Sequence, residues 1–386
     1  MAVVQLFHMK SAPPYRIPLS SPDIHADDIE LVVRVLRSNR LSIGPFIKQL
    51  ERDFADYIGT KYAVAVTNGT SGLHLCMRAA GLAEGDEVIT TPFSFIASAN
   101  CILYERATPV FVDIDEASLN IDPALVARAI TARTRAMLPV HVFGQPCAMD
   151  ELQAVCRDRN LVLVEDACEA VGAEYKGRKV GTFGKAAVFS FYPNKAMTLG
   201  EGAVVATDDP QWAELMQSLR NQGRSDGGTG YFSDRLGYNY RLDEMSAALG
   251  VAQLERLDRL LALRQAVATR YSEMLRRVPG VTVKSAVSST TRMSWFVFVI
   301  HLDPRIDRDR VIEQLEARGI PSRVYFTPIH LEPYYRERFG FRPGDFPVAE
   351  RVAASILALP FHTNLSDAEM DEVVAALQSA VVRAAA

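Results

Sequence analysis

A single lysine stands at the end of an apolar, aromatic segment and directly before a glycine-rich turn. The segment reads FSFYPNKAMTLGEGA and covers residues 189–203, with Lys195 near its middle. Lysine usually lies on a wet surface, so an exposed loop position is the simplest interpretation. If Lys195 instead lies inside the protein at a strand end, lost hydration favours its neutral amine, which is a nucleophile toward carbonyl groups.

Two adjacent carboxylates end a second apolar segment. It reads LVLVEDACEAVGAEYKG, residues 161–177, and places Glu165 and Asp166 at the end of a predicted strand. Neighbouring strand residues point to opposite sides, so one of the two points inward. An inward carboxylate in an apolar setting requires a cationic partner or a tuned proton, and a protonated ring nitrogen is such a partner. Helix capping by Asp166 is the structural alternative.

A third motif joins small polar residues to the start of a helix. The strand pattern YAVAV, residues 62–66, is followed by NGTSG, residues 68–72, which includes Gly69, Thr70 and Ser71. Free backbone amides and hydroxyls at a helix N-terminus form a site for a phosphate-sized anion. The glycines match neither the dinucleotide-binding fingerprint nor the Walker pattern, so a plain helix cap is the alternative.

The three motifs together describe one cofactor. An amine that can form a Schiff base, an anion cradle and a carboxylate facing a ring nitrogen are the groups that bind pyridoxal phosphate. All three follow predicted strands, and ligands of open parallel sheets bind beyond the carboxyl ends of the strands. The aromatic segment TTPFSFIASAN, residues 90–100, also follows a strand and is available to cover a ring face.

The elements that must position these motifs form an α/β pattern. Between about residues 21 and 250, short β-branched runs alternate with helix-length amphipathic segments, which predicts a mostly parallel central sheet with helices on both faces. The predicted strands cover residues 62–66, 87–90, 109–114, 135–143, 161–166, 186–191 and 203–207. Asp122 and Asp150 are predicted to cap helices.

A smaller C-terminal α+β domain is predicted to follow. We expect residues 1–250 to form an N-terminal segment and a large cofactor-binding domain, and residues 251–386 to form a connecting helix and a small domain. The helix extends to about residue 277, and strands follow at residues 294–302 and 322–326. Asp307 and Ser366 are predicted to begin helices, and residues 221–234 to form a mobile surface loop.

Composition narrows the classes of function. The 386 residues carry a net charge of −4 and 48% hydrophobic residues, so neither nucleic acid nor a membrane surface is an expected partner. The five cysteines are odd in number, widely spaced and without a CxxC pair, which predicts buried thiols and no metal site. Neither a leader pattern nor a long apolar run occurs, so we expect a soluble, cytoplasmic protein.

From about residue 17 to the final helix, the sequence resembles the DegT/StrS family of pyridoxal-phosphate-dependent nucleotide-sugar aminotransferases. The segments that carry the resemblance include NGTSGLHL, GDEVITTPFSFIASAN, VHVFGQPCAMDEL, VEDACEAVGAEYKG, GTFGKAAVFSFYPNK, LGYNYRLDEMSAALG and PIHLEPYY. The resemblance implies a fold type I PLP-dependent transferase. It also implies that Lys195 bonds the cofactor aldehyde and that Asp166 pairs with the pyridinium nitrogen.

The same resemblance implies further site residues. The residues that would hold the cofactor phosphate are Gly69, Thr70, Ser71 and Ser190, together with Asn239 from the neighbouring subunit of a homodimer with shared sites. Phe95 would stack on the cofactor ring, with Phe93 as the second choice, and Glu169 would contact the ring hydroxyl. His330 would either face substrate or pack inside the protein.

Two positions depart from the family pattern. Glu169 stands where relatives often have Gln or His, and beside a phenolate-like oxygen a carboxylate is repelled unless one group keeps a proton. Ala203 stands in GEGA where the family usually reads GEGG, which matters little unless the position needs positive φ.

The implied activity is transfer of an amino group from an amino acid, most often L-glutamate, to a nucleotide-linked keto sugar. Lys195 is retained where dehydrases of the family have histidine, which favours transamination. The segment YFTPIHLEPYYRERFGFRPGDFP resembles perosamine-synthase-like members, which implies amino sugars for polysaccharides such as lipopolysaccharide O-antigen. The alternatives are a dehydrase or other fold type I enzyme, a non-catalytic regulatory homologue, and a nicotinamide-dependent dehydrogenase, which lacks its G-x-G-x-x-G turn here.

Overall fold

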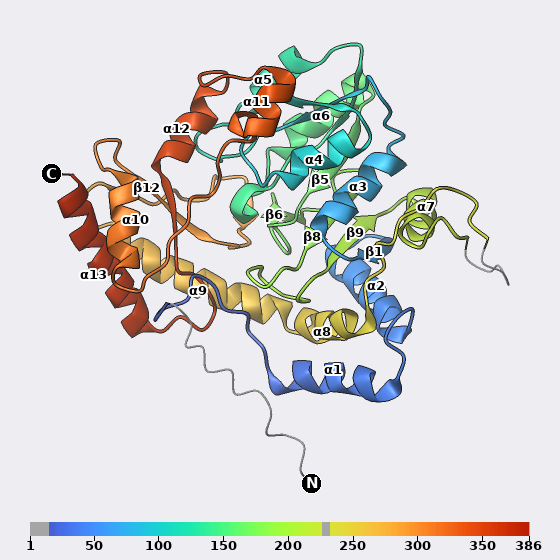
Figure 1. The fold of residues 1–386 in the computed structure, drawn as a ribbon, viewed down its shortest axis with the longest axis horizontal. Coiled ribbons are helices and arrows are strands. Elements are labelled where there is room, and N and C mark those ends of the chain that lie inside the picture. Colours follow the sequence, from blue (N-terminus) through green and yellow to red (C-terminus); the bar gives the residue numbers. More distant parts are fainter. Residues whose placement is uncertain (1–14, 226–231, 386) are drawn as a thin grey trace, which may run out of the picture.

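A seven-stranded sheet forms the centre of the large part of the molecule (Figure 1). The computed structural model describes residues 15–225 and 232–385. The strand order is β1-β9-β8-β5-β4-β2-β3, and every neighbouring pair is parallel except the two that involve β9. The strands are β1 (Tyr62–Val66), β2 (Glu87–Thr90), β3 (Thr108–Phe111), β4 (Thr134–Met137), β5 (Val162–Asp166), β8 (Ala186–Ser190) and β9 (Ala203–Thr207). The predicted mostly parallel sheet is confirmed.

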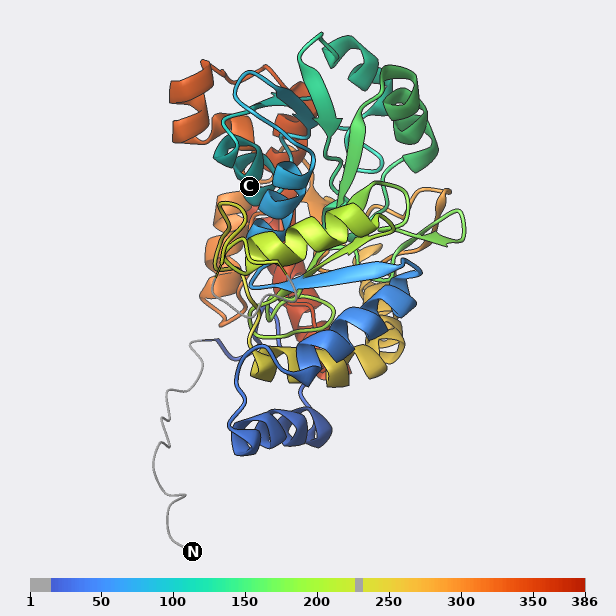
Figure 2. The ribbon, with the colours of Figure 1, turned by 90° about the vertical axis from the view of Figure 1, so that its right-hand side faces the viewer.

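Helices cover both faces of this sheet because alternate strand residues are apolar on either side. In β1, Ala63 and Ala65 face one core, while Val64 and Val66 face the other. The first face carries α2 (Pro45–Ile58), α5 (Pro123–Ala129), α6 (Met149–Arg159) and α8 (Glu244–Glu255), and the second carries α3 (Gly69–Ala79), α4 (Ala97–Tyr104) and α7 (Pro210–Arg220). Figure 2 shows these layers edge-on, with α1 (Ala26–Ser38) outside α8.

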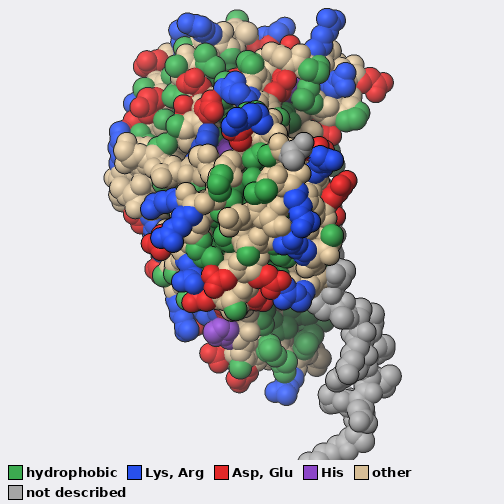
Figure 3. All heavy atoms as spheres, turned by 90° about the vertical axis from the view of Figure 1, so that its left-hand side faces the viewer, with side chains coloured by type: hydrophobic (Ala, Val, Ile, Leu, Met, Phe, Trp, Pro, Cys, Tyr) green, Lys and Arg blue, Asp and Glu red, His purple; other side chains and the backbone are tan. Residues whose placement is uncertain are grey.

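A second part of the chain contains a three-stranded antiparallel sheet of β10 (Val281–Thr282), β12 (Phe298–Leu302) and β13 (Ile356–Leu359). Four further helices belong to this half of the sequence: α10 (Arg308–Glu316), α11 (Pro333–Phe339), α12 (Pro347–Ser355) and α13 (Asp367–Ala384). Asp307 and Ser366 cap α10 and α13 as predicted. On the face that carries α10 and α13, positive and negative side chains are interspersed (Figure 3).

One long helix links the two cores. The leucines near the start of α9 (Leu257–Leu275) lie in the core of the large sheet, whereas Val267, Tyr271 and Leu275 lie in the core of the second sheet. The predicted helix from residue 251 to 277 is therefore interrupted, because α8 ends before Arg256 and α9 starts after it. The division into two domains at residue 250 stays a prediction.

Other local predictions were partly wrong. Residues 322–326 form only an isolated bridge, between Arg323 and Ala358 on the outer edge of β13, and no continuous strand. Asp122 caps α5 as predicted, but α6 begins at Met149, so Asp150 lies in its first turn. In the predicted surface loop, positions 226–231 lie outside the described residues.

A third, small sheet joins the two halves of the sequence. It consists of β6 (Glu174–Tyr175), β7 (Arg178–Lys179) and β11 (Thr290–Arg292). Among the helices of residues 15–225 and 232–385, none combines the length and the apolar character needed to cross a bilayer.

Candidate active site

A cavity of about 350 Å³ lies at the carboxyl end of the large sheet. The segments that follow β1, β2, β5 and β8 all contribute to its wall, as does the second part of the chain. The polar and aromatic lining residues are Asn68, Thr70, Ser94, Phe95, Ser98, Asp166, Glu169, Ser190, Tyr192, Asn194, Lys195, Glu201, Phe296, Tyr325 and Phe326. Three larger open grooves lie elsewhere among the described residues, and none of the three includes Lys195 or Asp166.

Lys195 directs its amine into this cavity. The residue follows β8, and a backbone turn in which the Lys195 N–H donates to the Tyr192 carbonyl fixes its place. Its side chain is only 13% exposed, and Nζ lies 3.8 Å from Glu169 Oε1. Nζ also lies 3.7 Å from the centroid of the Phe296 ring. The amine is thus shielded from bulk water by an aromatic ring and a carboxyl group, and the surface interpretation of Lys195 does not apply.

Asp166 is buried at the last position of β5 and faces the same cavity. Its Oδ2 accepts a hydrogen bond of 2.7 Å from the Ser98 hydroxyl, and its Oδ1 accepts one of 3.1 Å from the Cys168 N–H. Within the described residues, its carboxylate forms no ion pair. A turn follows β5, so the alternative of helix capping by Asp166 is wrong.

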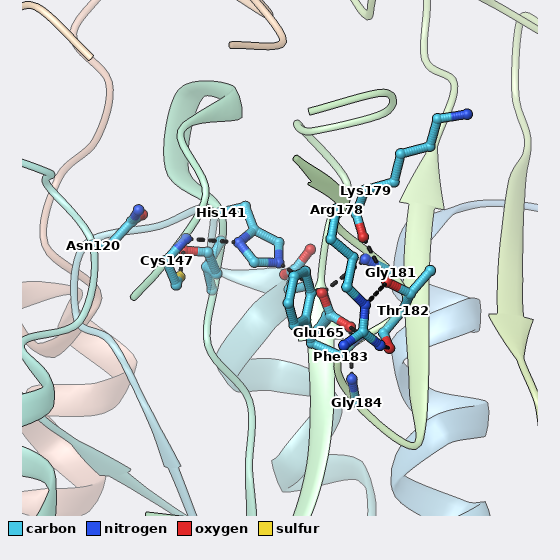
Figure 4. Close-up of polar contacts among 12 residues, drawn as sticks. Asn120, His141, Cys147, Glu165, Arg178, Lys179, Gly181, Thr182, Phe183 and Gly184 are labelled. Carbon is cyan, nitrogen blue, oxygen red and sulfur yellow. Dashed lines mark hydrogen bonds and ion pairs between the residues drawn. The ribbon is translucent and has the colours of Figure 1, made fainter. Parts of the chain in front are cut away.

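Its neighbour Glu165 points to the other side of the sheet and is held by a closed polar network (Figure 4). The carboxylate accepts backbone N–H groups from Gly181, Phe183 and Gly184 at 2.7–2.8 Å. It also contacts His141 Nε2 at 3.1 Å. The Cys147 N–H donates to His141 Nδ1, so the histidine carries its proton on Nε2 and donates it to Glu165. The two adjacent carboxylates, Glu165 and Asp166, are therefore both buried, although the sequence led us to expect that only one of them would point inward.

We predict that Glu165 contributes to stability. Glu165→Ala leaves three buried N–H groups without an acceptor, at roughly 1–3 kcal/mol each, so the free energy of unfolding is expected to fall by about 3 kcal/mol or more. Urea unfolding of the full chain, followed by circular dichroism, measures this loss. Glu165→Gln keeps one acceptor oxygen and is expected to lose less. A loss below about 1 kcal/mol for the alanine variant would contradict the prediction.

Glu169 is buried beside Lys195 and holds a proton more tightly than an ordinary glutamate. Its Oε2 accepts the Phe143 N–H at 2.8 Å, which leaves Oε1 toward the amine. Burial raises the pKa of the carboxyl, and the nearby Lys195 lowers it only in part. The raised pKa of Glu169 favours its neutral form, and a neutral carboxyl is not repelled by a phenolate-like oxygen.

This burial predicts a pH-dependent stability for the cofactor-free chain. Because the folded-state pKa of Glu169 is raised above 4.5, from that pH upward the folded chain retains a proton that the unfolded chain has released. The contribution of Glu169 to the free energy of unfolding therefore falls as pH rises through this window. Glu169→Gln removes the titration, so its stability relative to the wild type should increase with pH. Urea unfolding at several pH values tests this, and a constant difference would contradict it.

The start of α3 forms a cradle at the cavity wall. Gly69 and Thr70 open the helix and line the cavity, with Ser190 beside them. A Cβ at Gly69 would lie 3.0 Å from Cys168 Sγ and 3.1 Å from Ser190 Cβ, so a side chain there would crowd the cradle. Ser71 is different, because its hydroxyl donates to the Asn68 carbonyl and accepts the Asn68 N–H, which completes a capping box. The segment after β1 thus forms both a helix cap and a group of small polar residues at the cavity wall, which the sequence had left as alternatives.

The remaining predicted residues separate into those at the cavity and those away from it. Phe95 is 59% exposed and lines the cavity, whereas Phe93 is fully buried against Phe143 and Phe326. His330 is buried in the second half of the chain, where Nε2 contacts Glu350 Oε1 at 2.9 Å, and it does not line the cavity. Asn239 is exposed and also lies outside the lining.

The described residues fit pyridoxal phosphate. The cavity combines a shielded amine, a helix N-terminus with hydroxyls, and a carboxylate that lacks a cationic side-chain partner. Asn194 Oδ1 is buried there without a hydrogen-bond partner, so it has an unused acceptor. Sequence reasoning assigned no role in the site to Phe296 or Tyr325, which reach the cavity only through the tertiary fold.

Comparisons with known proteins agree with this geometry. The sequence model of the DegT/DnrJ/EryC1/StrS aminotransferase family matches residues 22–378. The chain is 41% identical to a GDP-perosamine synthase of Caulobacter vibrioides over 370 residues, which cover 95% of this chain and 99% of that protein.

Solved structures show the same fold. DesV of S. venezuelae, in complex with a ketimine intermediate, is 37% identical with a TM-score of 0.86, and the match covers 92% of this chain and 94% of that one. Spr1654 from Streptococcus pneumoniae in its PLP form is 29% identical with a TM-score of 0.91, and the match covers 96% of this chain and 100% of that one. This chain therefore belongs to the DegT/DnrJ/EryC1/StrS aminotransferase family and is a pyridoxal-phosphate-dependent sugar aminotransferase.

Proposed function

We propose that this enzyme transfers an amino group from L-glutamate to a nucleotide-linked keto sugar and releases a nucleotide-linked amino sugar. The observation that carries the proposal is the meeting of the Lys195 amine and the Asp166 carboxylate in one cavity of about 350 Å³. The similarity to a GDP-perosamine synthase supports a 4-amino sugar destined for a polysaccharide, such as an O-antigen.

The residues of the chain divide the work of binding and proton transfer. Gly69, Thr70 and Ser190 would hold the cofactor phosphate, and Phe95 would cover one face of its ring. Asp166, held by Ser98, would keep the ring nitrogen protonated. When bound, pyridoxal phosphate supplies a carbonyl that receives the amino group and a ring that accepts electrons.

Lys195 would move the proton. Among the described residues that line the cavity, it is the one with an amine. Its flexible stem would allow Nζ to take a proton from the carbon that bears the amino group and to deliver it to the carbon on the other side of that nitrogen. Arginine, which stays protonated, lacks this capacity. Retention of lysine here supports transamination over dehydration.

We further propose that the enzyme acts as a cytoplasmic homodimer with shared active sites and that each subunit has two domains, 1–250 and 251–386. Asn239 is exposed and available to a neighbouring subunit. Phe232 and Leu236 are 80% and 81% exposed close to it in the sequence, which favours burial against a partner. Sedimentation of the purified chain tests the dimer.

The test of the activity is a direct assay. Purified enzyme is incubated with L-glutamate and keto sugars carried on UDP, dTDP or GDP, and both 2-oxoglutarate and the amino sugar are measured. We expect the two products in equal amounts with one of the carriers. A sugar that loses a hydroxyl without gaining nitrogen would establish a dehydrase instead. Absence of any borohydride-reducible adduct on the chain would support a non-catalytic homologue.

A further inference from the structure

An arginine is buried beside the active site with backbone carbonyls as its partners. Arg264 lies in α9 and is 2% exposed. Its guanidinium donates to the carbonyl of Lys195 at 2.9 Å and to those of Trp295 and Phe296 at 3.2 Å each. Across residues 15–225 and 232–385, no carboxylate lies within ion-pair distance of it.

Such an arrangement is costly for a residue that only fills space. A buried charge without a counter-ion is disfavoured, and apolar side chains of similar volume often replace buried charges without loss of stability. Burial lowers the pKa of Arg264 to about 10, so the group is still protonated at neutral pH. The planar guanidinium holds its N–H donors in a rigid arrangement that can bind several carbonyls at once. A lysine ammonium, on a flexible side chain, holds them less firmly.

The carbonyls that Arg264 binds belong to the two segments that meet at the reactive amine. Lys195 follows β8 of the large sheet, whereas Phe296 precedes β12 of the second sheet. Their side chains meet in the cavity, where the Lys195 amine lies over the Phe296 ring. The Arg264 guanidinium thus forms hydrogen bonds with the backbones of both Lys195 and Phe296, the two residues whose side chains are in contact in the cavity.

We propose that Arg264 is a positioning residue that fixes the backbone of Lys195 against Phe296 and thereby sets the direction of the Lys195 amine in the cavity. This inference rests on the proposed role of Lys195. Displacements of about 1 Å at a reacting group can cost roughly 100-fold in rate, so a loosened backbone at this point should be visible in kinetics.

Two variants and a matched control test the proposal on the full-length enzyme. Arg264→Met removes all three hydrogen bonds, and Arg264→Lys restores a cation with less reach. Arg308→Met is the control, because Arg308 also donates to a backbone carbonyl, that of Ala353, but in the second half of the chain and away from Lys195. Each protein is assayed for kcat, for KM of the keto sugar and for melting temperature.

A second readout does not depend on turnover. Cofactor-free protein is mixed with pyridoxal phosphate, quenched with borohydride at intervals, and the adduct on Lys195 is quantified by mass spectrometry. This rate can be measured even if the wild type aminates none of the sugars tested, so failure of the proposed function is distinguishable from failure of this inference.

For Arg264→Met we expect kcat and the rate of adduct formation to fall by about 10- to 100-fold, with little change in KM. Arg264→Lys should recover part of both, and Arg308→Met should keep both near wild type whatever its melting temperature. Adduct formation at the wild-type rate in Arg264→Met would overturn the proposal, as would losses no larger than in the control. If Arg264→Met does not fold, a wild-type rate in Arg264→Lys overturns it and a reduced rate supports it.

Discussion

Lys195→Ala is expected to give a folded protein whose turnover is lower by about 10⁴-fold or more, because one residue supplies both the nucleophile and the base. The fold should persist, since the contacts of the amine with described residues are a carboxyl at 3.8 Å and an aromatic ring. Keto-acid release measures the turnover, and circular dichroism checks the fold.

The matched control lies at the other end of the same strand. Lys185 precedes β8 and pairs with Asp209 on the surface, so Lys185→Ala should retain turnover within about twofold. Comparable activity in the two variants would show that Lys195 does not carry the chemistry.

Asp166→Asn is expected to bind the cofactor yet to lose about 100- to 1,000-fold in kcat, since an amide does not stabilise a positive ring nitrogen as a carboxylate does. The amide is close to isosteric, and Ser98 can reorient its hydroxyl to accept from the new N–H, so the local structure should survive. Cofactor content measured by absorbance, together with kcat, separates loss of binding from loss of rate.

Glu165→Gln is the natural comparison for Asp166→Asn. It removes a neighbouring carboxylate that faces away from the cavity and binds backbone amides instead. We expect Glu165→Gln to reduce stability more than kcat, and Asp166→Asn to show the opposite order. Equal kinetic losses in the two variants would refute the specific role of Asp166.

The residues brought together at strand ends were accessible from the sequence for a physical reason. Parallel strands place their carboxyl ends at one edge, so motifs far apart in sequence, such as those at Gly69, Asp166 and Lys195, must converge once the strands are identified. No comparable rule places Phe296 or Tyr325, which reach the cavity through the packing of the second sheet. The local sequence pattern does not predict how the second sheet packs at the cavity.

The errors in element prediction have a similar origin. Residues 322–326 have β-forming side chains, but they meet the outer edge of β13 at a single bridge, and local propensity does not determine how far such pairing extends. The interruption between α8 and α9 at Arg256 lies in a segment without glycine or proline, so no helix-breaking residue predicts it. Asp150 lies in the first turn of α6 because the helix starts earlier with the buried Met149.

The helix α9 constrains how the enzyme admits its substrates. Residues of its first turns pack in the hydrophobic core of the large sheet, and residues of its later turns pack in the core of the second sheet. Moving the two halves of the chain apart would require α9 to break, or it would expose one of the apolar surfaces of α9 to solvent. Rigid-body opening of the two halves therefore carries a free-energy cost, and we expect the irregular segments at the rim to move instead when the substrate enters.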